Sequence, residues 1–208
     1  MKEKEELRLN ELKKIDRYFF DKGIKLVAGI DEAGRGPLAG PVVVASVILD
    51  EKSMIEGIND SKKVSEHKRE KIFDIITSEA ISYGVGIVYQ EEIDEINILQ
   101  ATKKALTMAI TQMEIKPNII LVDALTNIDT LSIPYQSIIK GDAKSYSIAA
   151  ASIIAKVTRD RIMREYDKVY PQYGFAGHKG YGTAKHIAAI KEFGPCPLHR
   201  RSFIKNFI

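Results

Sequence analysis

A short loop rich in glycine and proline, lying between two apolar runs, limits what this chain can fold into more than any other feature. The first run covers residues 26–31 and leads into Asp31 and Glu32, and the second covers residues 42–50. The loop between them is too short for the helix that a parallel crossover needs, so we expect the two runs to form an antiparallel pair of strands. Two adjacent carboxylates then lie where the first strand meets the loop.

The rest of the chain alternates between helical and strand-like patterns. Residues 1–22 predict a charged helix, ended by Gly23, with a thin apolar stripe of Leu9, Leu12, Ile15 and Phe19. Apolar spacing predicts helices over residues 65–79, 91–115, 144–165 and 183–193, and strands over residues 82–89, 118–123 and 134–139. The first two of these helices are expected to bury one apolar stripe each. The stripes consist of Ile72, Ile75 and Ile76 in the first helix and Ile96, Leu99, Leu106, Ile110 and Met113 in the second. Residues 171–182 hold five Gly or Pro in twelve positions, which predicts a loop.

This order of elements predicts an α/β fold built on a mixed five-stranded sheet. Three antiparallel strands are followed by parallel ones, and helices flank both faces. The C-terminal part, residues 144–208, is expected to be helical and basic. Because the chain of 208 residues has no internal repeat, low-complexity tract or linker, we expect a single domain over residues 1–208.

Composition excludes several classes of protein. No apolar run is long enough to cross a bilayer, and residues 1–6 are too charged to begin a signal peptide. Cys196 is the only cysteine, which excludes an intrachain disulfide and a thiolate metal cluster. We therefore expect a cytoplasmic, monomeric protein that binds no membrane.

Charge is unevenly distributed along the chain. Residues 156–208 carry 11 Lys and Arg against 4 Asp and Glu, whereas residues 1–155 carry 20 against 24. A basic C-terminal quarter suits a polyanionic partner, although a solvated basic surface explains the same charge.

Four acids stand where the chain leaves, or is about to leave, an apolar element: Asp31, Glu32, Asp123 and Asp142. If the first and fourth strands are parallel neighbours, Asp31 and Asp123 emerge at the same edge of the sheet, where ligands of open α/β sheets bind. Several carboxylates in one place repel each other unless a cation neutralises them. Oxygen-only ligands favour Mg²⁺ or Mn²⁺, and two such ions about 4 Å apart can activate water and stabilise the leaving oxygen of a phosphodiester.

Each acid also has a simpler interpretation. Asp142 is in a position to cap the N-terminus of a helix, and Asp123 is a common turn residue. The adjacent Asp31 and Glu32 are weak evidence by themselves. The metal interpretation therefore depends on all four acids together.

The loop after the acidic pair matches one nucleotide-binding pattern by letter. Residues 34–39, Gly-Arg-Gly-Pro-Leu-Ala, fit G-x-G-x-x-A, but that pattern opens a helix, whereas Pro41 and a β-branched run follow here. Two acids would also repel a pyrophosphate. A Walker A loop is absent because Gly40 is followed by proline. The glycines are better explained as allowing backbone amides to approach a sugar or a phosphate closely.

Residues 29–41, Gly-Ile-Asp-Glu-Ala-Gly-Arg-Gly-Pro-Leu-Ala-Gly-Pro, resemble the signature of type 2 ribonucleases H, the bacterial ribonuclease HII family. The resemblance extends over about residues 26–203. Further motifs follow in the family's order at residues 59–62, 122–123, 140–145, 150–160, 178–183 and 199–203.

The resemblance implies a function and a fold. The fold is RNase H-like, and the activity is endonucleolytic cleavage of the RNA strand in RNA–DNA hybrids and incision on the 5′ side of a single ribonucleotide in duplex DNA. Products carry 3′-hydroxyl and 5′-phosphate ends. The resemblance implies that Asp31, Glu32, Asp123 and Asp142 are the catalytic acids and hold two Mg²⁺ or Mn²⁺ ions.

The resemblance also implies which residues contact the nucleic acid. The turn Gly34-Arg35-Gly36 meets the ribose 2′-hydroxyl, the group that distinguishes RNA from DNA, and Tyr181 stacks on the sugar of the deoxynucleotide just downstream. Phosphate contacts, which position a substrate without specifying its sequence, are expected from Asn59, Ser61, Lys62, Lys144, Ser145 and Lys156.

Alternatives remain for these residues and for the function. Tyr181 is otherwise a half-buried aromatic in a loop, and any one of the lysines is otherwise solvated surface. A module of the same fold that binds nucleic acid without cutting it, or a nuclease or recombinase directed at DNA, would carry many of the same features.

Overall fold

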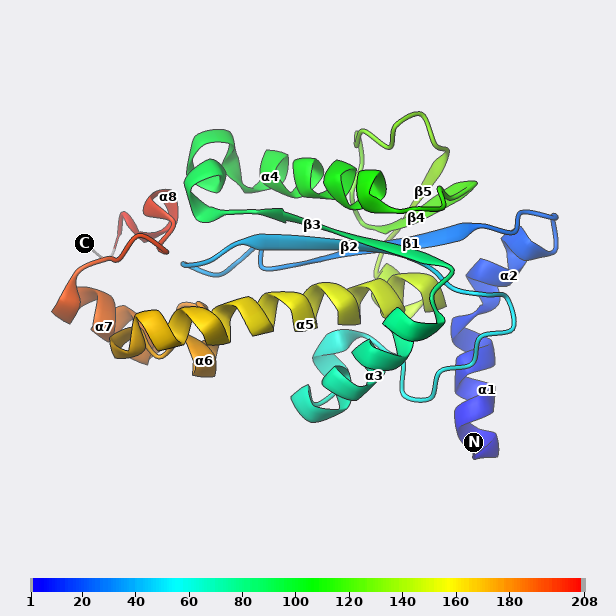
Figure 1. The fold of residues 1–208 in the computed structure, drawn as a ribbon, viewed down its shortest axis with the longest axis horizontal. Coiled ribbons are helices and arrows are strands. Elements are labelled where there is room, and N and C mark those ends of the chain that lie inside the picture. Colours follow the sequence, from blue (N-terminus) through cyan, green and yellow to red (C-terminus); the bar gives the residue numbers. More distant parts are fainter. Residues whose placement is uncertain (1, 207–208) are drawn as a thin grey trace.

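The computed structural model describes residues 2–206 and contains a five-stranded mixed sheet (Figure 1). Its strands are β1 (Val27–Ala33), β2 (Val42–Ile48), β3 (Ser82–Val88), β4 (Ile119–Asp123) and β5 (Tyr135–Ile138). The order across the sheet is β3-β2-β1-β4-β5. The pairs β1–β2 and β2–β3 are antiparallel, and β1–β4 and β4–β5 are parallel. The predicted sheet is confirmed.

Helices cover both faces of this sheet, with α4 on one face and α5 and α3 on the other (Figure 1). The helices are α1 (Glu3–Leu12), α2 (Lys14–Phe20), α3 (Glu66–Glu79), α4 (Gln90–Gln112), α5 (Tyr146–Val169), α6 (Phe175–His178), α7 (Ala184–Phe193) and α8 (Arg201–Ile204). Single 3₁₀ turns are η1 (Ser61–Lys63), η2 (Gly141–Ala143) and η3 (Pro171–Tyr173). The last turn η3 and the short α6 lie in the segment for which a loop was predicted.

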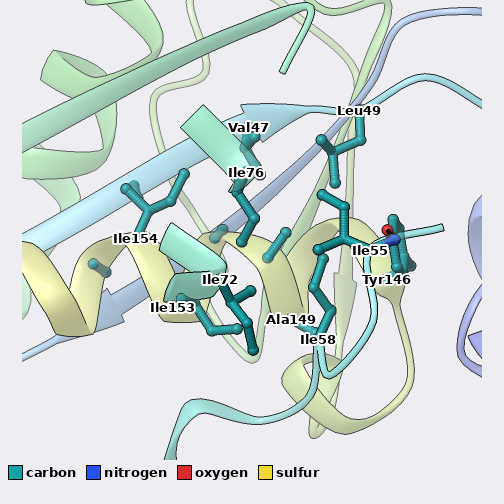
Figure 2. Close-up of a cluster of buried hydrophobic side chains, with 14 of the residues drawn as sticks. Val47, Leu49, Ile55, Ile58, Ile72, Ile76, Tyr146, Ala149, Ile153 and Ile154 are labelled. Carbon is teal, nitrogen blue, oxygen red and sulfur yellow. Dashed lines mark hydrogen bonds between the residues drawn. The ribbon is translucent and has the colours of Figure 1, made fainter. Parts of the chain in front are cut away.

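Strand β2 separates two hydrophobic cores. All seven of its residues are buried, as expected for a central strand covered on both faces. Val47 and its alternate neighbours face α3 and α5, where they pack with Ile72, Ile76 and Ile154 (Figure 2). The residues between them face α4 on the opposite side of the sheet. The sheet is therefore clamped between two helix layers, which keeps its strand ends in a fixed position.

Gly29 sets the distance between β1 and α5. A Cβ at this position would lie 2.0 Å from the carbonyl carbon of Ser147, so only glycine lets the first turn of α5 rest on the strand. The small residues that follow in α5, Ala149, Ala150 and Ala151, are all fully buried. The close contact places the first turn of α5 beside Gly29, two residues before Asp31.

The N-terminal helix is not continuous, contrary to the prediction. It is interrupted at Lys13, which lies between α1 and α2. Lys13 is buried, and its ammonium donates to the carbonyls of Glu51 and Ser53. The helix is broken where this charged side chain turns inward to reach the backbone carbonyls. The predicted helix also included Met1, which lies outside the described residues.

Two residues predicted to face inward are exposed. In α4 the backbone is kinked at Asn97 (φ +66°), whose side chain accepts hydrogen bonds from the N–H groups of Leu99 and Gln100. The kink restarts the helix and leaves Leu99 41% exposed. In α3 only Ile72 and Ile76 are buried, because the helix packs on α5 through a narrow stripe; Ile75 is 40% exposed. No helix between residues 2 and 206 is long and apolar enough to span a membrane.

Candidate active site

The sheet topology brings the predicted acids to one edge. In the parallel pair β1–β4, Ile30 lies beside Val122, so Asp31 and Asp123 follow at the carboxyl ends of neighbouring strands. Asp123 Oδ1 accepts a hydrogen bond of 2.7 Å from the N–H of Gly141, the first residue of η2. This bond ties β4 to the turn that carries Asp142. The capping role considered for Asp142 belongs instead to Ser145, the N-cap of α5.

Mutual repulsion among the acids is visible in their pKa values. Burial raises the pKa of Asp31 well above its ordinary value, and the charges of Glu32, Asp123 and Asp142 raise it further. Burial also raises the pKa of Glu32 and of Asp142, and Asp123 adds to both. Among the charged neighbours of Asp142, Asp60 raises its pKa most. The four predicted acids therefore share one electrostatic environment.

Cations of the chain offset part of this charge. Arg35 Nη1 lies 3.4 Å from Glu32 Oε1. Lys62 is partly desolvated, which by itself lowers its pKa, but Asp142 and the neighbouring acids outweigh this and raise it. Both cations are exposed, so they are also open to a polyanionic ligand.

Divalent cations fit this donor set. No three His, Cys, Asp or Glu side chains within residues 2–206 are arranged to hold a metal ion as they stand. The four carboxylates nevertheless offer only oxygen donors, which Mg²⁺ and Mn²⁺ prefer. The charge repulsion that raises the pKa of Asp31 is what a cation placed between these groups would relieve. The residues present therefore suit the ions predicted from the sequence.

Two buried arginines hold the loop between β1 and β2. Arg159 is 1% exposed and donates to the carbonyl oxygens of Pro41, Lys179 and Ala39 at 2.9, 2.9 and 3.1 Å. Arg200 is fully buried and donates to those of Gly34, Gly40 and Arg35 at 2.6, 2.9 and 3.0 Å. Burial lowers their pKa values, to about 10 for Arg159 and about 9 for Arg200, so both stay charged at neutral pH.

Tyr181 faces this loop. The residue is 44% exposed, and its Cε1 lies 4.0 Å from where a Cβ of Gly36 would stand. The cationic groups of Arg159 and Lys156 lie 5.9 and 6.0 Å from the ring centroid. The Tyr181 N–H donates to the carbonyl of His178 at 2.9 Å. The ring is thus an exposed surface on a well-anchored backbone.

Two hydrogen-bonded histidines, His186 and His199, hold the backbone of Tyr181 on its buried side. The carbonyl of Tyr181 can only accept, so His186 Nδ1, 2.9 Å away, carries the proton. The N–H of Cys196 donates to His199 Nδ1 at 3.0 Å, so His199 is protonated on Nε2. His199 Nε2 then donates to His186 Nε2 across 3.1 Å. Both rings are buried and neutral, and burial lowers the pKa of each to about 4.

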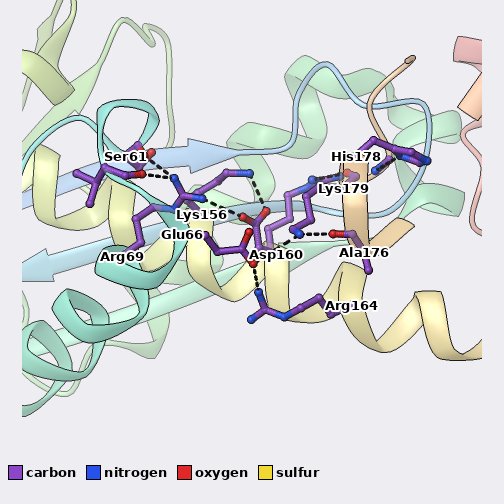
Figure 3. A network of polar contacts seen from close by, with 12 residues as sticks. Ser61, Glu66, Arg69, Lys156, Asp160, Arg164, Ala176, His178 and Lys179 are labelled. Carbon is purple, nitrogen blue, oxygen red and sulfur yellow. Dashed lines mark hydrogen bonds and ion pairs between the residues drawn. The ribbon is translucent and has the colours of Figure 1, made fainter. Parts of the chain in front are cut away.

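A charge network organises two of the predicted phosphate contacts (Figure 3). Lys156 Nζ lies 2.7 Å from Oδ1 of the buried Asp160, and Arg69 Nη2 lies 3.6 Å from its Oδ2. Arg69 Nη1 also donates to the carbonyl of Ser61 at 2.9 Å. Ser61 is itself buried and donates its N–H to Ser152 Oγ. Lys156 is therefore partly neutralised, and Ser61 is held by its backbone.

The other predicted contacts divide into exposed and buried residues. Lys62 and Lys144 are exposed, and Asn59 is half-buried. Asn59 and Lys144 line a hollow of about 450 Å³ beside α1 and α2. Ser145 is fully buried, and its Oγ accepts from the N–H of Ile148. The prediction that Ser145 contacts a phosphate was wrong, because its hydroxyl is turned into the protein as a helix cap.

Comparison with known proteins places the chain in a family. A family model described as Ribonuclease HII matches residues 28–206. The chain is 60% identical to the Ribonuclease HII of Acetivibrio thermocellus over 206 residues, which cover 99% of this chain and 80% of the relative. It is 55% identical to that of Caldanaerobacter subterraneus subsp. tengcongensis, also over 206 residues, covering 99% and 85%.

Solved structures agree. The ribonuclease H2 from Pyrococcus horikoshii OT3 is 31% identical, with a TM-score of 0.73 over 87% of this chain and 96% of that one. RNase HII in a complex with PCNA from Archaeoglobus fulgidus is 28% identical, with a TM-score of 0.73 over 88% and 96%. Membership sets aside the two alternatives, a binding module without cleavage and a nuclease directed at DNA. The chain belongs to the ribonuclease HII family, and it is a ribonuclease H that cleaves the RNA strand of RNA–DNA hybrids.

Proposed function

We propose that this enzyme also incises duplex DNA on the 5′ side of a single embedded ribonucleotide, leaving 3′-hydroxyl and 5′-phosphate ends. The observation that carries the proposal is the connection between β1 and β2. Within six residues it joins Asp31 and Glu32 to a turn, residues 34–36, that faces Tyr181. A single ribonucleotide offers one 2′-hydroxyl, so its recognition requires a sugar-reading turn directly beside the hydrolytic centre.

Asp31, Glu32, Asp123 and Asp142 would hold two Mg²⁺ or Mn²⁺ ions. The ions would supply an activated water and charge stabilisation for the leaving oxygen. The pKa values of Asp31, Glu32 and Asp142, raised by burial and mutual repulsion, support this assignment. A solved RNase HIII in complex with Mn²⁺, 19% identical with a TM-score of 0.66, has the same fold.

The remaining residues would bind and orient the duplex. The backbone of Gly34, Arg35 and Gly36 would meet the ribose, and Tyr181 would stack on the sugar of the deoxynucleotide downstream. Lys62, Lys144 and Asn59 would contact phosphates at the surface, with Ser61 and Lys156 behind them. In the absence of substrate Lys156 is paired with Asp160, so its contribution to phosphate binding would be smaller than that of the exposed Lys62.

The test is a panel of three duplexes of one sequence: all DNA, DNA with one ribonucleotide, and an RNA–DNA hybrid, each with Mg²⁺ or Mn²⁺. We expect cleavage of the last two, with a single 5′ incision at the ribonucleotide. Asp123→Asn should reduce turnover by more than about a hundredfold, because several kcal/mol of charge stabilisation are lost, while hybrid binding persists. Undiminished turnover in Asp123→Asn would remove the metal assignment, and an intact ribonucleotide-containing duplex would remove the incision.

A further inference from the structure

The turn over residues 34–36 has a backbone direction imposed by Arg200. Nη2 of Arg200 donates to the carbonyl oxygen of Gly34 at 2.6 Å, and Nη1 donates to that of Arg35 at 3.0 Å. In a strand, consecutive carbonyls point to opposite sides. Here the consecutive carbonyls of Gly34 and Arg35 both accept from one guanidinium, so the backbone turns between them. The φ of +98° at Gly34 provides this turn, which a side chain would oppose.

Two amide N–H groups point outward as a result. A trans peptide directs its C=O and the next N–H to opposite sides, so the N–H groups of Arg35 and Gly36 point away from Arg200. Among residues 2–206 neither of them donates to another backbone group. Both residues are exposed. Successive N–H groups directed to the same side form a concavity that binds oxygen acceptors.

We propose that Arg200 is a positioning residue for sugar recognition: it turns the N–H groups of Arg35 and Gly36 toward the substrate, where both donate to the 2′-hydroxyl oxygen of the ribonucleotide. This inference depends on the proposed function, which assigns the turn to the sugar. The carbonyls of Gly34 and Arg35 are occupied by Arg200, so the turn offers the sugar its amides. Tyr181 borders the same space, opposite Gly36.

Arginine is suited to this role by its geometry. Its rigid guanidinium presents several donors in one plane, and the third bond, from Nε to the carbonyl of Gly40, fixes the plane itself. A lysine ammonium carries the same charge but cannot hold the carbonyls of Gly34, Arg35 and Gly40 in one fixed arrangement. Arg200→Lys therefore separates geometry from charge.

Binding without divalent ions tests the proposal without cleavage. Affinities are measured for two duplexes that differ only in one ribonucleotide, in EDTA, for the wild type, Arg200→Lys and Lys13→Met. We expect the wild type to bind the ribonucleotide duplex more tightly than the all-DNA duplex. In Arg200→Lys the ratio of the two affinities should fall about tenfold, the equivalent of one or two hydrogen bonds. Lys13→Met is the control: Lys13 is also buried and donates to two backbone carbonyls, those of Glu51 and Ser53, which follow the far end of β2 from residues 34–36. It should lose thermal stability and keep the preference.

The outcomes separate this inference from the proposed function. A wild type without preference overturns the inference, whereas the proposed incision depends on the cleavage panel. A folded Arg200→Lys that retains the preference overturns the inference alone, and so does equal weakening on both duplexes, which would mean that the amides hold a phosphate. If Arg200→Lys does not fold, amide hydrogen exchange in the wild type decides. The amides of Arg35 and Gly36 should be protected by the ribonucleotide duplex and not by the all-DNA duplex, and equal protection by the two overturns the inference.

Discussion

Gly36 and Gly34 are glycines for different reasons. At Gly34 the φ is +98° and a Cβ would lie 2.1 Å from Arg159 Nε, so the folded backbone itself requires glycine. At Gly36 the φ lies outside the left-handed region, and the nearest atom to a Cβ is Tyr181 Cε1 at 4.0 Å. The protein alone therefore tolerates a methyl group at Gly36. What the missing side chain keeps open is the space between the turn and the tyrosine ring.

We therefore expect Gly36→Ala to fold normally and to lose activity. Its melting temperature should stay within about 2 °C of the wild type, as for a strain-free surface substitution, while kcat/KM on a single-ribonucleotide duplex falls at least about tenfold. Thermal unfolding and steady-state kinetics on the same preparation check this. Gly34→Ala is the control and should lose stability and activity together. A Gly36→Ala enzyme with full activity would show that no sugar enters this space.

Single residues mark the limit of prediction from sequence. The four acids, the turn and Tyr181 lie in continuous motifs; the structure brings the acids to one edge of the sheet and places Tyr181 opposite the turn. Arg159 and Arg200 lie in matched segments too, yet no role was assigned to them, because their carbonyl partners are more than a hundred positions away in most cases. Ser145 was assigned to a phosphate because its motif cannot distinguish a cap from a contact.

At the scale of elements, the N-terminal helices stabilise the start of α5. The buried Asp16 of α2 accepts hydrogen bonds from the N–H groups of Tyr146 and Ser147 at 3.0 and 3.1 Å. With Ser145 bonding the N–H of Ile148, three of the free amides at the helix start are satisfied. The sequence indicated only a thin apolar stripe for residues 1–22, since a cap contributed from 130 positions away leaves no local pattern.

Asp16→Ala should lower the free energy of unfolding by about 1–3 kcal/mol, because two buried N–H groups lose their acceptor. Asp16→Asn keeps an acceptor oxygen, so its free energy of unfolding should fall by less. Urea unfolding of the three proteins measures the difference. An unchanged midpoint for Asp16→Ala would contradict the capping role of α2.

Helices and strands were predicted best where the apolar pattern was long and where, for a strand, both faces are buried. The central strands were predicted correctly because their apolar runs are continuous. The parallel pairing of β1 with β4, which the metal hypothesis took as its condition, is present. The kink at Asn97 was missed because one polar side chain capping its own helix looks like an ordinary exposed position. The same kink moved Leu99 to the surface.

At the scale of the whole molecule, the buried histidines make stability depend on pH. Burial lowers the pKa of His186 and His199 to about 4 from the ordinary 6.5, so between these values the unfolded chain binds protons that the folded chain does not. Their contribution is complete above pH 6.5 and is lost as the pH falls toward 4. The expected slope is at most about 1.4 kcal/mol per pH unit for each histidine.

Urea unfolding at pH 7.5, 6.5, 5.5 and 4.5 checks this slope. Asp16 and Asp31 act in the opposite direction because their folded pKa values are raised, so variants must be compared. His186→Asn should flatten the profile between pH 6.5 and 4.5, whereas His67→Asn, at an exposed position, should not change it. Identical slopes in the wild type and His186→Asn would rule out the buried neutral histidine as the cause.

The clamp of Arg200 on the β1–β2 loop also has a consequence for synthesis on the ribosome. The acids of β1 emerge early, but the carbonyls of Gly34, Arg35 and Gly40 find their donor only when residue 200 has been added. A domain generally folds as a unit. The turn that we propose to read the sugar therefore takes its final shape only after the segment around residue 200 has been made and has docked on the β1–β2 loop.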